Sequence, residues 1–232
     1  MHISILTLFP EMFAGPFDHS IIKRAKAKNL VTLELVNIRA YAHDAYHTVD
    51  GRPYGGGAGM ILRVDIVDAA LKDTVSRFGK TKATTKIVLL DPQGTPFTQK
   101  KTAQLSRADH LILVCGHYEG VDARVRDLVD EQISIGDFVL TGGEIPALAI
   151  VDSVVRLLPG VLIKKEATVH ESFSEALLEY PQYTKPQVYK GKKVPQVLLS
   201  GNHAAIDAWR TSEQKKLTHR ARPDLLTRKH TR

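Results

Sequence analysis

The chain has 232 residues, of which 25% are charged and 43% are hydrophobic, and its formal net charge is +7. This length allows one large domain or a main domain with a small appendage, and it excludes two large domains. Residues 1–184 hold 20 basic and 22 acidic side chains, whereas residues 185–232 hold 12 and 3, so the body is −2 and the tail +9. Such a tail is typical of proteins that contact nucleic acid or another acidic surface, although basic tails are also often only solvated.

The single cysteine, Cys115, excludes an internal disulfide framework and a zinc site with several thiolates within one chain. The N-terminal segment lacks the basic region of a signal peptide, and Glu11 and Asp18 argue against a transit peptide. No apolar run reaches the roughly 20 residues that cross a bilayer. We therefore expect a cytoplasmic protein that makes no membrane contact.

Hydrophobic periodicity predicts alternating strands and helices from the start of the chain. Residues 2–9 alternate and then run apolar, rich in Ile and Leu, up to Pro10, which predicts a buried strand. Residues 10–29 have helical character, and residues 31–40 predict a strand with Leu33 and Leu35 on one face. The further expected elements are helices at 64–76, 98–107, 122–129 and 147–158, and strands at 86–90, 110–116 and 133–135. This order predicts an α/β fold with a mostly parallel sheet and helices on both faces.

The composition changes after Gly160. Residues 161–175 follow neither the helical nor the strand period, which predicts a flexible linker. Three prolines and a basic KGKK run then precede two amphipathic helices near residues 202–216 and 223–229. The expected organisation is a main domain at residues 1–160, a linker at 161–175 and a small, basic, all-helical domain at 176–232.

Common nucleotide and metal signatures are missing from the sequence. It has no GxxxxGK[ST] phosphate loop, and no GxGxxG joins a strand to a helix. His43 and His47 are four residues apart but lack the HExxH pattern, so we interpret them as surface residues and expect no metal site. Cys115 lies inside the apolar run LILVCG, which favours a buried, inert thiol over a nucleophile.

Residues 52–60, RPYGGGAGM, hold four glycines in five positions. Such a backbone can approach a planar or anionic ligand closely, although a flexible hairpin has the same composition. The residues before the glycines add a charge, a rigid turn and a stacking surface, which favours binding. We take Arg52, Tyr54, Gly57 and Gly59 as substrate-binding candidates.

Three further loops follow expected strands: LLDPQG at 89–94, CGHYEG at 115–120 and SIGDFVLTGGE at 134–144. Glycine after a strand is ordinary turn chemistry, so each loop alone is a weak signal. In open α/β sheets, however, ligands bind outside the carboxyl ends of the strands. The three loops together therefore predict a pocket that holds a small ligand largely through the backbone.

In this order and spacing, RPYGGGAGM, LLDPQG, CGHYEGVDARV, SIGDFVLTGGEIPA, RLLPGVL and LLEYPQYTKP resemble the bacterial tRNA (guanine-N1)-methyltransferases, which modify the guanosine next to the anticodon, at position 37. The resemblance covers nearly the whole chain. It implies a SPOUT-superfamily catalytic domain with a deep trefoil knot, a flexible linker, a C-terminal helical domain that binds tRNA, and a homodimer with its active site at the subunit interface. Whether Mg²⁺ is required stays open.

The same resemblance implies that the three loops hold S-adenosylmethionine. The residues carried over are Leu90, Pro92 and Gln93 of the first loop, Gly116, Tyr118 and Glu119 of the second, and Ile135, Gly136, Asp137, Phe138, Val139, Leu140, Gly142 and Gly143 of the third.

The family's proton acceptor is an aspartate that opens a D-S-F triplet, and here the triplet is Glu171-Ser172-Phe173. Its cationic partner corresponds to Arg156 of the other subunit. Guanine N1 needs a base to remove its proton, and O6 needs a cation as negative charge develops there. The extra methylene of Glu171 lengthens its reach, so either the linker spacing compensates or Glu179 or Asp137 assists. Without the resemblance, Glu171 reads as a solvated acid and Arg156 as a cation at a helix C-terminus.

We expect the basic tail to contact tRNA phosphates, with Glu179, Lys192, Lys193 and Lys215 as substrate-binding candidates. Trp209 lies at helical spacing from Ile206 and reads as a core residue. Two alternatives remain: a methyltransferase that acts on ribosomal RNA or another base position, and a non-catalytic RNA-binding protein that keeps the glycine loops for stability.

Overall fold

The computed structural model describes residues 1–78, 84–162, 171–173 and 176–227. The chain divides into two compact units, Met1–Ile163 and Lys164–Arg232. Most of the expected linker, residues 161–175, lies outside the described residues.

The first unit is built on a five-stranded sheet in the order β2-β1-β6-β5-β7. Its strands are β1 (His2–Thr7), β2 (Thr32–Asn37), β5 (Thr85–Pro96), β6 (His110–Cys115) and β7 (Glu131–Ser134). Every pairing between neighbours in this order is parallel. The expected α/β fold with a mostly parallel sheet is therefore confirmed.

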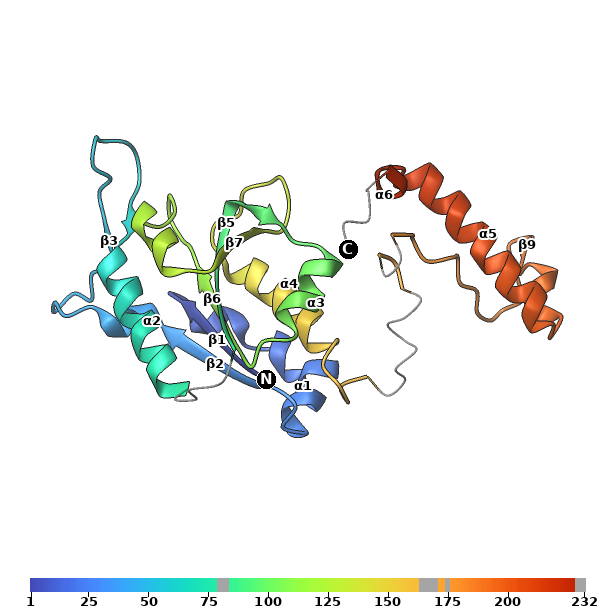
Figure 1. The fold of residues 1–232 in the computed structure, drawn as a ribbon, viewed down its shortest axis with the longest axis horizontal. Helices are drawn as coiled ribbons and strands as arrows, with labels where there is room; N and C mark the ends of the chain where they lie inside the picture. Colours follow the sequence, from blue (N-terminus) through green and yellow to red (C-terminus); the bar gives the residue numbers. More distant parts are fainter. Residues whose placement is uncertain (79–83, 163–170, 174–175, 228–232) are drawn as a thin grey trace. The chain divides into compact units, whose positions relative to one another are not determined.

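Helices cover both faces of this sheet (Figure 1). One face packs against α1 (Ser20–Ala27), α3 (Gln99–Leu105) and α4 (Glu144–Val155). The opposite face packs against α2 (Val64–Phe78) and the 3₁₀ helices η3 (Ile38–Tyr41) and η4 (Ala123–Leu128). The unit also contains the 3₁₀ helices η1 (Pro10–Phe13) and η2 (Pro16–Asp18) and the short antiparallel pair β3 (Asp50–Gly51) and β4 (Ile61–Leu62).

Strand β6 shows why the sheet needs helices on both sides. Its six residues are all buried, with Leu111 and Leu113 in the core of the α4 face and Ile112 and Val114 in the core of the α2 face. Successive side chains of a strand point to opposite faces, so an uninterrupted apolar run can be buried only between two layers.

Three elements differ from the expectation. Strand β5 continues to Pro96, beyond the expected end at residue 90, because β7 pairs with it both before and after a register irregularity between Leu90 and Thr95. The expected helix at 122–129 is the 3₁₀ helix η4. Leu35 is 38% exposed because β2 is an edge strand, although its neighbour Val36 on the other face is buried.

The second unit contains the 3₁₀ helix η6 (Gln196–Leu199) and the helices α5 (His203–Ala221) and α6 (Asp224–Thr227). It is not all-helical, because β8 (Val188–Tyr189) and β9 (Lys192–Lys193) form an antiparallel hairpin. Lys190 and Gly191 connect them with φ angles of 51° and 77°, the left-handed conformations that a tight two-residue hairpin turn requires. Trp209 is partly buried and lies 6.3 Å from Tyr183, measured between ring centroids. Among the described residues, none of the helices is long and apolar enough to cross a membrane.

A buried polar cluster lies where β1 and β6 begin. The hydroxyl of Ser4 is 2.9 Å from His110 Nε2 and donates to the Glu34 carboxylate, and the ring of Phe78 packs against His110. His110 is only 1% exposed. Burial, with a smaller contribution from the neighbouring His2, lowers the pKa of His110 from 6.5 to about 4.

This pKa predicts an acid-sensitive fold. The unfolded chain protonates His110 below pH 6.5, whereas the folded chain does so only near pH 4, so stability is lost as pH falls through this window. Between pH 7 and 5 the loss from this group is about 2 kcal/mol. Urea titrations of the wild type and of His110→Gln at both pH values measure it, and equal pH dependence in the two proteins would contradict the assignment.

Candidate functional site

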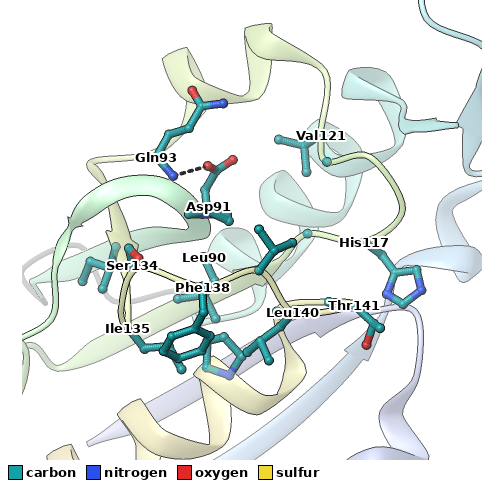
Figure 2. A pocket seen from close by; sticks show the side chains of 18 of the residues that line it. Leu90, Asp91, Gln93, His117, Val121, Ser134, Ile135, Phe138, Leu140 and Thr141 are labelled. Carbon is teal, nitrogen blue, oxygen red and sulfur yellow. Dashed lines mark hydrogen bonds between the residues drawn. The ribbon is translucent and has the colours of Figure 1, made fainter. Parts of the chain in front are cut away.

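A cavity of about 230 Å³ lies at the carboxyl ends of β6 and β7, beside the irregular stretch of β5. Figure 2 shows Leu90, Asp91 and Gln93 on one side of it, and Ile135, Phe138 and Leu140 below them. Three stretches of chain form its wall, at residues 90–93, 116–121 and 133–143, together with Pro146. They overlap the three loops predicted at residues 89–94, 115–120 and 134–144, here called the first, second and third loops.

The structure brings nearly all of the expected cofactor residues together. Of the fourteen, only Asp137 does not line the cavity. Those that do are Leu90, Pro92, Gln93, Gly116, Tyr118, Glu119, Ile135, Gly136, Phe138, Val139, Leu140, Gly142 and Gly143.

The second and third loops are joined through their backbones. The N–H of Gly143 donates to the carbonyl of Gly116 at 2.8 Å, and His117 forms a bridge with Gly142. A Cβ at Gly143 would lie 2.6 Å from the Cα of Cys115, which real side chains do not tolerate. Glycine at this position is therefore a condition for the loops to meet.

Side chains hold the rim of the cavity in place. The N–H of Gln93 donates to Asp91 at 2.8 Å (Figure 2), and the side-chain oxygen of Gln93 accepts from Arg126 at 2.7 Å. The hydroxyl of Tyr118 accepts from Arg39 at 3.3 Å, and Tyr118 has a φ of 60°. These contacts tie the first and second loops to neighbouring elements of the same unit.

Part of the glycine-rich segment at residues 52–60 contacts the second loop. The N–H of Glu119 donates to the carbonyl of Met60 at 3.1 Å, and a Cβ at Gly59 would collide with the Glu119 side chain. Tyr54 is fully exposed, and Arg52 and Gly57 are exposed as well. Gly59 is thus placed beside the cavity, whereas the other three substrate-binding candidates lie on the surface of the segment.

Arg156 and Glu171 belong to different units. Arg156 is half-buried at the C-terminus of α4, and its N–H donates to Asp152 at 3.3 Å. Within the second unit, the hydroxyl of Ser172 accepts from the N–H of Glu179 at 2.9 Å, which brings Glu171 and Glu179 into one region. Thr218 of α5 fixes the same segment through the N–H of Leu178.

The basic candidates of the second unit are exposed. Lys192 and Lys193 form β9, and Lys215 lies on α5. Tyr189, in the paired strand β8, is 62% exposed. The hairpin thus offers cations and an aromatic ring on one short element.

Sequence reasoning missed several residues of the cavity wall. They are Asp91, His117, Gly120, Val121, Ile133, Ser134, Thr141 and Pro146. Five of them lie inside the three predicted loops but were not named as cofactor residues, and widening the second and third loops by one residue would have added Val121 and Ile133. Behind the wall lies Glu144, a carboxylate that is only 1% exposed and accepts from the Thr7 hydroxyl at 2.7 Å. Its position at the start of a helix gave no signal of burial.

Two expectations about reactive groups can be compared with the structure. Cys115 is buried, as expected, and burial, with the nearby Glu144 carboxylate, raises the pKa of its thiol well above 9.0. His43 and His47 are exposed. Within the described ranges, no three His, Cys, Asp or Glu side chains form a group that could hold a metal ion.

Comparison with known proteins identifies the family. Residues 1–228 match the family model described as tRNA (Guanine-1)-methyltransferase TrmD. The chain belongs to this family. It is 54% identical to the tRNA (guanine-N(1)-)-methyltransferase of Bacillus subtilis, over 97% of this chain and 92% of the relative. The enzymes of the same name from Pelotomaculum thermopropionicum and Staphylococcus aureus (strain JH9) are 51% and 50% identical, over 97% of this chain and 90% and 91% of their own.

The contact at Gly143 predicts the effect of one methyl group. Gly143→Ala must push apart the backbones of the second and third loops, so we expect a loss of about 1 to 3 kcal/mol in the free energy of unfolding. The rate of methyl transfer to tRNA, measured per folded molecule, should fall as well. Gly51→Ala is the matched control, because a Cβ there meets nothing within 4 Å. Full activity in Gly143→Ala would show that the cavity does not depend on this contact.

Proposed function

We propose that this protein is a cytoplasmic enzyme that transfers the methyl group of S-adenosylmethionine to N1 of the guanosine at position 37 of tRNA, next to the anticodon. Membership in the tRNA (guanine-N1)-methyltransferase family supports the reaction class. The cavity formed by the three loops is the observation that carries the choice of donor.

The residues present suit this donor. Leu90, Ile133 and Leu140 offer apolar surface for an adenine ring, and the glycines of the second and third loops expose backbone groups that can hydrogen-bond to it. Asp91 and Glu119, also in the wall, offer carboxylates to the positive charges of the donor. The bound donor would supply an electrophilic methyl group, carried on a sulfonium.

The protein's own task is proton removal at the base. Glu171 accepts the proton from guanine N1, which makes N1 nucleophilic. Arg156 donates hydrogen bonds to O6 and stabilises the negative charge that develops there. Glu179, held near Glu171 through Ser172, is placed to assist with the proton or with the substrate.

We further propose that two copies of the chain form a homodimer in which Arg156 of one subunit and Glu171 of the other act on the same guanine. Apolar side chains exposed on and beside the third loop support an interface there: Phe138 at 54%, Val139 at 84% and Ile145 at 50%. We also propose that the chain around the cavity is threaded as a trefoil knot, a topology consistent with the close backbone contact at Gly143.

The second unit is the proposed grip on tRNA. Its exposed lysines can neutralise phosphates without reading sequence, and Tyr189 can stack on an unpaired base. The requirement for Mg²⁺ is a matter for experiment.

Incubating the chain with labelled S-adenosylmethionine and unmodified tRNA that bears guanosine at position 37 tests the proposal. We expect label at N1 of that nucleotide, located by nuclease digestion and mass spectrometry. Label in ribosomal RNA or at another atom would replace the proposed substrate. Binding of tRNA without any transfer would favour a non-catalytic RNA-binding protein.

The assigned roles predict a split between binding and turnover. Glu171→Gln removes the base, and Arg156→Ala removes the cation at O6, so we expect each to lower kcat by about 10²-fold or more. The Kd for the methyl donor, measured by calorimetry, should change little. Glu171→Asp restores the carboxylate and is the matched control. An equal loss of donor binding in either variant would mean that the residue is structural.

Substitutions of the tail lysines should weaken tRNA binding without changing donor binding. Replacing Lys192, Lys193, Lys215 and Lys216 with Glu removes phosphate contacts and adds repulsion, so we expect weaker tRNA binding and a smaller dependence of its Kd on salt. Filter binding between 50 and 200 mM salt measures the Kd for tRNA and its dependence on salt. Over this range the Debye length falls from about 14 to about 7 Å. Donor affinity should stay unchanged, and a parallel fall would contradict the separation of the two tasks.

A further inference from the structure

Glu144 is a buried carboxylate whose role the chemistry above does not use. Its Oε1 accepts the hydroxyl proton of Thr7 at 2.7 Å, and Thr7 Oγ1 in turn accepts the N–H of Phe9 at 2.9 Å. A carboxylate that is 1% exposed is costly unless several partners compensate it. Glu144 ends the third loop and opens α4, a position that favours negative charge but does not account for Oε2.

Oε2 of Glu144 faces His117. The two are 4.0 Å apart, measured to His117 Nδ1, which is longer than a hydrogen bond. His117 Nδ1 is buried and has no hydrogen-bond partner among the described residues. The His117 ring also packs against Phe9, with 4.8 Å between ring centroids. A buried polar atom without a partner in a native fold needs an explanation.

Gly142 lies between these two side chains. A Cβ built on it would collide with Glu144 Oε2 and would lie 2.5 Å from His117 Nδ1. Gly142 also forms the backbone bridge with His117. The pair therefore encloses the point at which the second and third loops meet.

His117 belongs to the cavity wall, yet its ring is directed away from the first loop. Figure 2 shows the ring on the side of Thr141, far from Asp91 and Gln93. A ligand in the cavity can thus contact the main chain of His117, while the ring of His117 faces Glu144. This arrangement links ligand binding to the buried carboxylate.

We propose that Glu144 is a positioning residue for the methyl-donor pocket: it holds His117, and through the bridge to Gly142 it sets the spacing of the second and third loops. The gap of 4.0 Å closes to a hydrogen bond, Nδ1–H to Oε2, when the donor fills the cavity. The inference rests on the proposed function, because the ligand it invokes is the methyl donor.

Calorimetry on the full chain tests this proposal with two probes, S-adenosylmethionine and S-adenosylhomocysteine, which lacks the positive charge of the sulfonium. Glu144→Gln keeps the shape of the side chain but weakens the acceptor, so we expect both ligands to bind about 10-fold more weakly. The matched control is Glu34→Gln. Glu34 likewise contacts a β1 hydroxyl, Ser4, and a histidine, His2, but it lies on β2 beside the first half of β1, away from the carboxyl ends of the strands. Glu34→Gln should leave the affinities for both ligands unchanged.

A second measurement reports the contact itself. In protein labelled with ¹⁵N-histidine, a Nδ1–H signal of His117, identified by its loss in His117→Gln, should appear when either ligand saturates the wild type. It should be missing in Glu144→Gln. If Glu144→Gln does not fold, Thr7→Val removes the other support of the carboxylate and should weaken both ligands, whereas Thr7→Ser should not.

The outcomes separate the two levels of inference. Failure of the wild type to bind S-adenosylmethionine overturns the proposed function and this proposal together. Normal binding by the wild type with undiminished binding by Glu144→Gln overturns only the positioning role. Weaker binding of the charged donor alone, with S-adenosylhomocysteine unaffected, would show that Glu144 acts through its charge and not through position.

Discussion

The close backbone contact between the second and third loops is the constraint on which the cavity depends. Gly143 can donate to Gly116 only because Gly143 carries no side chain, and the turn into α4 starts directly from this contact. The apolar wall of the cavity then includes Leu90 of β5 and Ile133 of β7, which are paired in the sheet. Removing the contact would separate the second loop from the third.

The sheet itself was predictable because its physical signal is local. Alternate residues of β6 enter two different cores, so its sequence is apolar without interruption, and such a strand requires a layer on each side. The extension of β5 was not predictable. Asp91, Pro92 and Gln93 read as a loop, and only β7, about 40 residues further along the chain, shows that pairing resumes after them.

The candidate site likewise has residues that the sequence predicts and residues that it does not. Its glycines stand out in the sequence because backbone conformation and close approach restrict the residue type. Glu144 does not stand out, because an acid in the first turn of a helix is usually solvated, and its burial depends on Thr7, which is 137 residues away. The β8–β9 hairpin was missed for a similar reason: two residues on each side of a Lys-Gly turn are too few to show a period.

Cys115 gives the molecule a built-in reporter of motion. It is the single thiol in the chain, it has no exposed surface, and it sits at the end of the central strand beside the contact between the loops. A thiol reagent can reach it only when the sheet or the loop contact opens, since burial also keeps the reactive thiolate form scarce. The rate of labelling in native conditions therefore measures how often the wall of the cavity opens, without any engineered probe.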